Sequence, residues 1–230
     1  MQQRFSHLAP GYATQSDTQR QIAADLIAAL GEPVCGAVLD VGCGHGNLYE
    51  LVKKRCDRFV GIDFAPGMCA LHPKGRGVEI LQIDFNLPLA LQALQAHAPF
   101  DLILSSSALQ WAEDLGRTLN ALRPLGNRFA LAIATSQSFS ELHGRVAIKS
   151  PLPDRHTIER AIESTLGLKG CVRRYTLEFE TPRMLLNYVR QSGVSGFHHG
   201  LSYRQVRTLM EDRTLKRLSF EVVMAVGQPG

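Results

Sequence analysis

The residues best suited to bind a ligand form a glycine-rich segment at positions 40–46, with the sequence Asp-Val-Gly-Cys-Gly-His-Gly. The segment begins within the apolar run 37–41 and precedes helical spacing, so we expect a strand, a tight turn and a helix. Glycines at such a turn let the backbone approach a ligand closely. The spacing is GxGxG rather than the GxGxxG of dinucleotide sites, and no P-loop Lys-Ser/Thr pair follows. Because Asp40 puts a carboxylate beside the turn, the segment favours a positively charged ligand over a phosphate.

Polar side chains also stand at the ends of three further predicted strands. Asp63 ends the first strand, Asp84-Phe85 ends the second, and Ser105-Ser106 ends the third. An acid like Asp63, about 20 residues after the glycine turn, can accept hydrogen bonds from both hydroxyls of a ribose. At 84–85 a carboxylate could take an adenine amino group while the aromatic ring packs on the base. Any one of these features alone is typical of an ordinary turn or helix cap. Four of them at successive strand ends indicate a nucleoside site.

These residues need a parallel sheet to bring the strand ends together. We predict strands at 37–41, 58–63, 78–84, 100–106, 127–135, 173–180 and 218–226, and helices at 16–30, 48–54, 154–166, 182–192 and 203–213. Strands alternating with helices predict an α/β fold with a doubly wound, mostly parallel, seven-stranded sheet. We expect one domain, 1–230, made of an N-terminal arm and helix (1–35), a cofactor-binding core (36–136), a substrate lid (137–217) and a last strand (218–230) at the sheet edge.

Composition excludes several other classes of protein. The chain has 230 residues, 45% of them apolar, with a formal net charge of +4, which is too weakly basic to indicate nucleic-acid binding. Its five cysteines form no CxxC pair, and its eight histidines show no metal-ligand spacing, so we expect reduced thiols and no metal. The start shows no secretory signal and no apolar run is long enough for a membrane helix. We therefore expect a cytoplasmic protein with no membrane partner, and a monomer.

Over residues 36–136 the motif set resembles the class I S-adenosylmethionine-dependent methyltransferases, whose fold is Rossmann-like. The resemblance implies S-adenosylmethionine as the cofactor. The residues that we expect at its site are Asp40, Gly42, Cys43, Gly44, Gly46, Asp63, Phe64, Met68, Asp84, Phe85 and Ser105.

The flanking segments resemble a narrower family, the malonyl-[acyl carrier protein] O-methyltransferases of biotin synthesis. The segments that carry this resemblance are 4–12 (RFSHLAPGY), Gln19-Arg20, 106–111 (SSALQW), 123–124, 138–142 (SFSEL), 185–194 and 220–223. The resemblance implies methylation of the free malonyl carboxylate on an acidic carrier protein or on coenzyme A.

Two groups of residues are candidates for the acceptor. We expect Tyr12, Gln110 and Trp111 at the methyl-transfer crevice, with a core position for Trp111 and an anchoring role for Tyr12 as the alternatives. The candidates for holding the carboxylate or the carrier protein are Arg145, Lys149, Arg173 and Arg174, each of which could instead be an ordinary solvated charge.

Other functions remain open at this point. The sequence does not match the malonyl family cleanly at 143–157 or after Gly196, and these segments are the ones expected to contact the substrate. A class I methyltransferase acting on another small acid, such as an aconitate-like acid, or on a quinone precursor is therefore one alternative. A non-catalytic partner subunit with the same fold is another, although the complete glycine motif argues against it. The GxGxG spacing disfavours a nicotinamide oxidoreductase.

Overall fold

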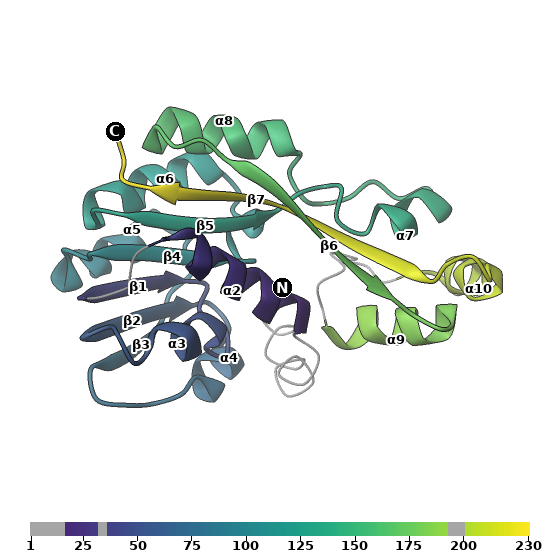
Figure 1. Cartoon of the computed structure of the whole chain (residues 1–230), viewed down its shortest axis with the longest axis horizontal. Helices are drawn as coiled ribbons and strands as arrows, with labels where there is room; N and C mark the ends of the chain where they lie inside the picture. Colours follow the sequence, from purple (N-terminus) through teal and green to yellow (C-terminus); the bar gives the residue numbers. More distant parts are fainter. Residues whose placement is uncertain (1–16, 32–35, 193–200) are drawn as a thin grey trace.

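The computed structural model describes residues 17–31, 36–192 and 201–230. Seven strands form one sheet in the order β3-β2-β1-β4-β5-β7-β6 (Figure 1). They are β1 (Ala37–Val41), β2 (Arg58–Asp63), β3 (Val78–Gln82), β4 (Leu102–Ser106), β5 (Phe129–Ala134), β6 (Cys171–Glu178) and β7 (Arg217–Gly227). The first five strands in this order pair parallel, and β7 runs antiparallel to both β5 and β6. The predicted α/β class and the mostly parallel seven-stranded sheet are confirmed.

One detail of the predicted sheet is wrong. The last strand, β7, was expected at the sheet edge, but it lies between β5 and β6, so that β6 forms the edge. The burial of the two strands explains the order. Six successive residues of β7, from Phe220 to Ala225, are buried, as expected of an interior strand, whereas β6 alternates between exposed and covered residues.

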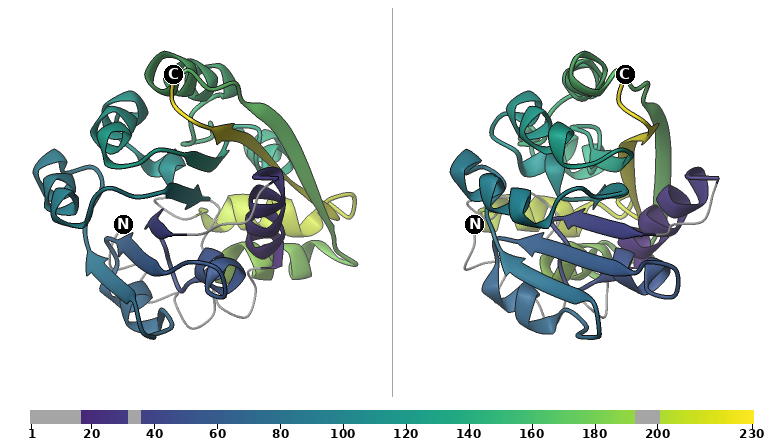
Figure 2. Two further views of the ribbon diagram at one scale, coloured as in Figure 1. Left: turned by 60° about the vertical axis from the view of Figure 1, so that its left-hand side comes forward. Right: turned by 90° about the vertical axis from the view of Figure 1, so that its left-hand side faces the viewer.

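The helices cover both faces of the sheet (Figure 2). They are α2 (Asp17–Ala29), α3 (Asn47–Val52), α4 (Pro66–Leu71), α5 (Pro88–Gln92), α6 (Leu115–Leu122), α7 (Ser140–Arg145), α8 (Arg155–Leu166), α9 (Pro182–Ser192) and α10 (Tyr203–Glu211). Three short 3-10 helices join the larger elements of the described ranges: η1 (Ala93–His97), η2 (Leu109–Trp111) and η3 (Arg123–Leu125).

Two apolar clusters fill the space between the helices and the sheet. Val38 of β1 belongs to the cluster beneath α2, α3, α7, α9 and α10, whereas its neighbour Leu39 belongs to the cluster beneath α5, α6 and α8. Successive residues of a strand point to opposite faces, so a strand covered on both sides must be apolar throughout. This requirement makes the central strands visible in the sequence as short, uninterrupted apolar runs.

The region expected to form a lid, 137–217, contributes β6 to the sheet and α8 to its covering layer, while its other helices lie at one end of the molecule. Figure 1 shows α7, α9 and α10 together at one end of the molecule, beside the ends of β6 and β7. Local sequence sets where α8 and α10 begin: Asp154 caps α8, and Ser202 and Gln205 form a capping box on α10.

Within the described ranges, no helix combines the length and the apolar character needed to cross a bilayer.

Candidate functional site

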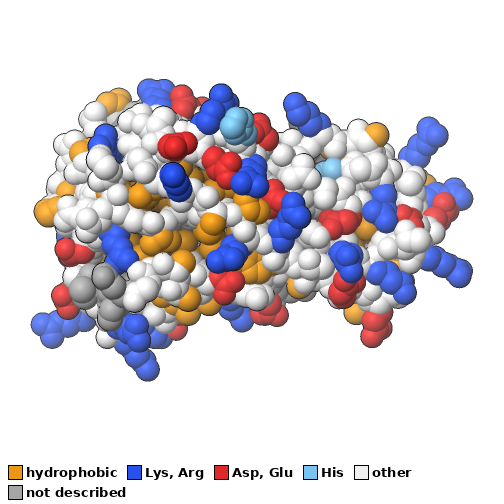
Figure 3. Space-filling model, turned by 45° about the horizontal axis from the view of Figure 1, so that its top comes forward, with side chains coloured by type: hydrophobic (Ala, Val, Ile, Leu, Met, Phe, Trp, Pro, Cys, Tyr) orange, Lys and Arg blue, Asp and Glu red, His pale blue; other side chains and the backbone are white. Residues whose placement is uncertain are grey.

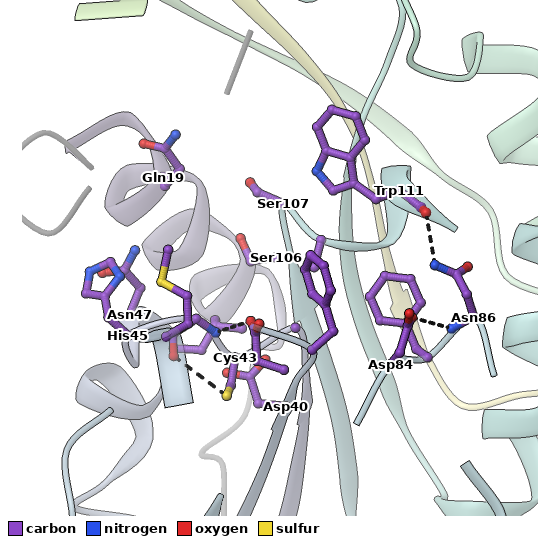
Figure 4. Close-up of a pocket in the computed structure, with 18 of the residues that line it drawn as sticks. Gln19, Asp40, Cys43, His45, Asn47, Asp84, Asn86, Ser106, Ser107 and Trp111 are labelled. Carbon is purple, nitrogen blue, oxygen red and sulfur yellow. Dashed lines mark hydrogen bonds between the residues drawn. The ribbon is translucent and has the colours of Figure 1, made fainter. Parts of the chain in front are cut away.

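A cavity with a volume of about 270 Å³, called here the larger cavity, lies at the carboxyl ends of the parallel strands (Figure 4). Its walls come from the turn after β1, the ends of β2 and β4, the segment after β3, and the start of α2. Ten of the residues predicted to bind a cofactor or to catalyse line it: Asp40, Gly42, Cys43, Gly44, Asp63, Phe64, Met68, Asp84, Phe85 and Trp111. The strand ends therefore meet where the sequence predicted.

The glycine turn is held against β2 by hydrogen bonds. The Gly42 and Cys43 N–H groups both donate to the Ile62 carbonyl, at 2.8 and 2.9 Å. The Asp63 carboxylate accepts from the Gly44 N–H at 3.0 Å and from the Ala65 N–H at 2.8 Å. Burial raises the pKa of Asp63 and these two N–H groups oppose the rise. Asp63 thus fixes the turn while its carboxylate still faces the larger cavity.

Asp40 carries a buried carboxylate with no partner. Its side chain is 1% exposed, and neither oxygen has a hydrogen-bond partner in the described part of the chain. Burial, and then the nearby charge of Asp63, raise the pKa of Asp40 well above its usual range. Leaving a buried carboxylate unpaired is costly unless a ligand pairs with it. Because Asp40 lines the larger cavity, that cavity suits a group with positive charge and several N–H donors.

The other titratable groups at the cavity add no positive charge. Burial, and then the charge of Arg20, lower the pKa of His45, so that its ring is mainly neutral at pH 7. Burial, followed by the charges of Asp40 and Asp63, raises the pKa of the Cys43 thiol, which stays protonated. The described residues bring no three His, Cys, Asp or Glu side chains together in a way that could hold a metal ion.

Comparisons with known proteins agree with this geometry. A family model described as a methyltransferase domain matches residues 39–127, which contain the glycine turn and both downstream acids. The malonyl-[acyl-carrier protein] O-methyltransferase of Acetivibrio thermocellus is 28% identical over 94% of this chain and 84% of its own length. The protein of the same name from Pseudescherichia vulneris is 28% identical over 85% of this chain and 80% of its own. A putative methyltransferase from Bacillus halodurans superposes with a TM-score of 0.62 at 13% identity, covering 91% of this chain and 100% of that one.

Residues 39–127 match a methyltransferase domain, and this match, together with the relatives named as O-methyltransferases, identifies a methyltransferase enzyme. The similarity to the solved structure concerns the fold. A second named relative, the trans-aconitate 2-methyltransferase of an Azoarcus species, is 32% identical over 62% of this chain and 55% of its own length.

Two residues predicted at the cofactor site of this methyltransferase lie elsewhere. Gly46 does not line the larger cavity. It begins α3 with a φ of +98°, and a β carbon there would lie 2.7 Å from Pro73, so glycine is required by backbone geometry. Ser105 is fully buried and its hydroxyl donates to the Val41 carbonyl at 2.7 Å. It ties β4 to β1 and does not line the larger cavity.

The neighbouring serine gives a direct check of this correction. We expect Ser105→Ala to lower the free energy of unfolding by about 1–2 kcal/mol, because it removes a buried hydrogen bond. Affinity for S-adenosylmethionine should change less than about twofold. Ser106 is the matched control: its hydroxyl lines the larger cavity and has no partner among the described residues, so Ser106→Ala should leave stability unchanged. Denaturant unfolding and calorimetry measure both quantities; equal stability losses would contradict the assignment.

The residues predicted to bind the methyl acceptor do not lie together in the structure. Gln110 lies beside a smaller cavity, which Trp111 also lines. Tyr12 lies outside the described residues. Arg145 forms an ion pair with Asp212, and Arg174 one with Glu221. Neither of these two arginines, nor Lys149 or Arg173, lines either cavity.

The basic side chains do not form one patch on the face shown in Figure 3, where Lys and Arg are interspersed with Asp and Glu. Hydrogen bonds from Thr214 and from Arg145 lower the pKa of Asp212 to about 2, so the Arg145–Asp212 pair is charged at neutral pH. Arg145 is therefore already occupied in linking α7 to the segment after α10. Any contact with a carboxylate or a carrier protein would compete with this pair.

Sequence reasoning assigned no cofactor or catalytic role to several other residues that line the larger cavity. They are Gln19, His45, Asn47, Leu48, Asn86, Ser107, Ala108 and Glu113. Asn86 was detectable from its place two residues after Asp84. Its side chain accepts from the Glu113 N–H at 2.8 Å and donates to the Trp111 carbonyl at 3.4 Å, which orders the segment after η2 (Figure 4).

Proposed function

We propose that this methyltransferase transfers a methyl group from S-adenosylmethionine to the free carboxylate of a malonyl group carried on acyl carrier protein, at the start of biotin synthesis. The observation that carries the proposal is the extent of similarity. Three relatives named malonyl-[acyl-carrier protein] O-methyltransferase match across 85–94% of the chain, including the segments beyond the shared methyltransferase core. Two others of that name and the trans-aconitate relative match 62% of it.

The described residues fit S-adenosylmethionine. The unpaired Asp40 carboxylate suits the amino group of its methionyl part, and the Gly44 backbone faces open space where any side chain would intrude. We assign Asp63 to the ribose hydroxyls and Asp84 with Phe85 to the adenine. Asp63 can accept these bonds in addition to its two backbone bonds, because a carboxylate has about four acceptor positions.

The proposed methyl transfer requires little from the protein beyond alignment of the two reactants. When bound, S-adenosylmethionine supplies a methyl group on a sulfonium: a C–O bond forms as the C–S bond breaks, and the electron pair stays on sulfur. A carboxylate is already ionised at neutral pH, so no general base is required. The chain's contribution is to orient the two reactants and to exclude water, for which Phe85, Met68 and Trp111 are placed around the larger cavity.

The test is methyl transfer from labelled S-adenosylmethionine to malonyl-acyl carrier protein, with malonyl-coenzyme A, free malonate and aconitate in parallel. We expect a base-labile methyl ester on the malonyl thioester. Acetyl-acyl carrier protein is the matched control, because it lacks the free carboxylate and should remain unlabelled. Label on aconitate but not on the malonyl thioester would overturn the substrate assignment and retain the methyltransferase.

A further inference from the structure

A smaller cavity, with a volume of about 40 Å³, adjoins the larger one. Gln19, Ser107 and Trp111 line both, so the two cavities share a wall. Its remaining lining is mostly apolar and comes from α2, the ends of β5 and β7, and the segments after β5: Ile22, Ala134, Phe139, Leu152, Phe220 and Val222. Among the described residues, no charged side chain lines it. A group that enters from the larger cavity must therefore be small and held by neutral contacts.

Gln19 is a polar side chain that the fold itself does not explain. It is 4% exposed, and neither its Oε1 nor its Nε2 has a partner in the described part of the chain. A buried amide without hydrogen bonds is destabilising, and the residues one turn further along α2, Ile22 and Ala23, are apolar and buried. Its position at the shared wall lets a ligand in either cavity form hydrogen bonds with the amide.

Gln110 supplies a second amide, but in a fixed orientation. Its Nε2 donates to the Ser107 carbonyl at 2.7 Å, which leaves its Oε1 buried and unpartnered within the described ranges. Ser107 and Phe139, which also line the smaller cavity, are two of the three described non-glycine residues with positive φ, at +59° and +62°. Strained backbone of this kind gathers at functional sites. The cavity therefore presents a free N–H donor from Gln19 and a fixed carbonyl oxygen from Gln110.

We propose that the smaller cavity holds the acyl part of the methyl acceptor, with Gln19 Nε2–H donating to the carboxylate that is methylated. Gln110 Oε1 faces the remainder of the acyl group and repels a second anionic group. The acceptor class is then a short acyl group with one carboxylate and a neutral remainder, such as a thioester. This inference rests on the proposed function and narrows its substrate class.

Neutral amides suit this role better than a cation would. A hydrogen bond to an ionised group is stronger when its donor is also charged, and a strongly held carboxylate is a weaker nucleophile. An amide donor orients the oxygen while leaving its charge to be neutralised by the transfer itself. The absence of a charged side chain from the described lining also explains why free dicarboxylates should be poor acceptors.

The test compares Gln19→Met with the wild type. Methionine fills the same volume without polar atoms, so the melting temperature of the ligand-free variant should equal or exceed that of the wild type. A residue with a purely structural role would instead lower it. With malonyl thioester as acceptor, kcat/KM should fall at least about tenfold, while affinity for S-adenosylmethionine changes less than about twofold. Gln92→Met, at an exposed position of α5, is the matched control and should change neither quantity.

Wild-type enzyme should also prefer malonyl thioester over free malonate by at least about tenfold in kcat/KM. Unchanged kinetics in Gln19→Met, with methylation of the thioester intact in the wild type, would overturn the role of Gln19 and leave the proposed function standing. Equal use of free malonate would overturn the exclusion by Gln110. Binding of S-adenosylmethionine without methylation of any malonyl compound would overturn both the substrate proposal and this inference.

Discussion

Replacing Asp40 with asparagine should weaken S-adenosylmethionine binding by about 10- to 150-fold, the range for loss of a hydrogen bond to a charged group. The ligand-free protein should be as stable as the wild type or more stable, because the substitution removes a buried carboxylate without partners among the described residues. Calorimetric titration measures the affinity, and thermal unfolding measures the stability. The opposite signs of the two effects distinguish a ligand-binding carboxylate from a structural one.

The same carboxylate predicts a dependence on pH. Burial raises the pKa of Asp40 in the folded protein above its unfolded value near 4. Ionised Asp40 is thus disfavoured by folding, so the ligand-free wild type should lose stability as pH rises from about 4 through the folded pKa. Affinity for the cationic ligand should rise over the same interval, because binding requires the carboxylate to lose its proton.

Asp40→Asn should remove the part of both pH dependences that Asp40 causes, whereas Asp57→Asn should not. Asp57 is exposed and immediately precedes β2, so its substitution controls for the change of net charge. If Asp40→Asn instead destabilises the ligand-free protein while affinity is kept, the carboxylate supports the fold and not the ligand.

The strand ends could be predicted because each depends on local sequence. A parallel strand covered on both faces needs a mostly apolar run, and β1 and β2 were predicted with their observed bounds. Asp63 ends β2, Asp84 follows the edge strand β3, and parallel strands bring their carboxyl ends to one edge. The presence of both acids at the larger cavity therefore follows from the fold class alone.

Sequence-based prediction of the site residues fails where a residue's role depends on a shift of one position along a strand or on a partner far away in the sequence. Ser105 and Ser106 are adjacent and identical, but successive strand residues face opposite ways, so only the latter reaches the larger cavity. Arg145 could not be assigned because its partner, Asp212, lies 67 residues away in sequence. Gln19 lines the cavities only because α2 packs across the ends of other elements, which no local pattern indicates.

Substitution of the glycines in the turn is the second change expected to have a large effect on stability and binding. Two of these glycines, Gly42 and Gly44, are required for different reasons. A β carbon on Gly42 would lie 2.2 Å from the β carbon of Ala108, and φ there is +77°. Gly42→Ala should therefore lower the free energy of unfolding by about 2–5 kcal/mol, from left-handed backbone strain and overpacking together. At Gly44 φ is +54°, but no heavy atom lies within 4 Å of a built β carbon. Gly44→Ala should cost only the strain, about 1–2 kcal/mol.

Affinity for S-adenosylmethionine should distinguish an alanine substitution at Gly44 from the same substitution at a comparable glycine outside the cavity. Gly44 lines the larger cavity, so an added methyl group would occupy space that we assign to S-adenosylmethionine and weaken its binding by about 5- to 150-fold. Gly31 is the matched control: its φ is +69° and no heavy atom of the described residues lies within 4 Å of a built β carbon, but it follows α2 and does not line the cavity. Gly31→Ala should lose similar stability and keep its affinity. Since the two variants differ only in whether the new methyl group meets the ligand, equal affinities would mean that the cofactor does not approach the glycine turn.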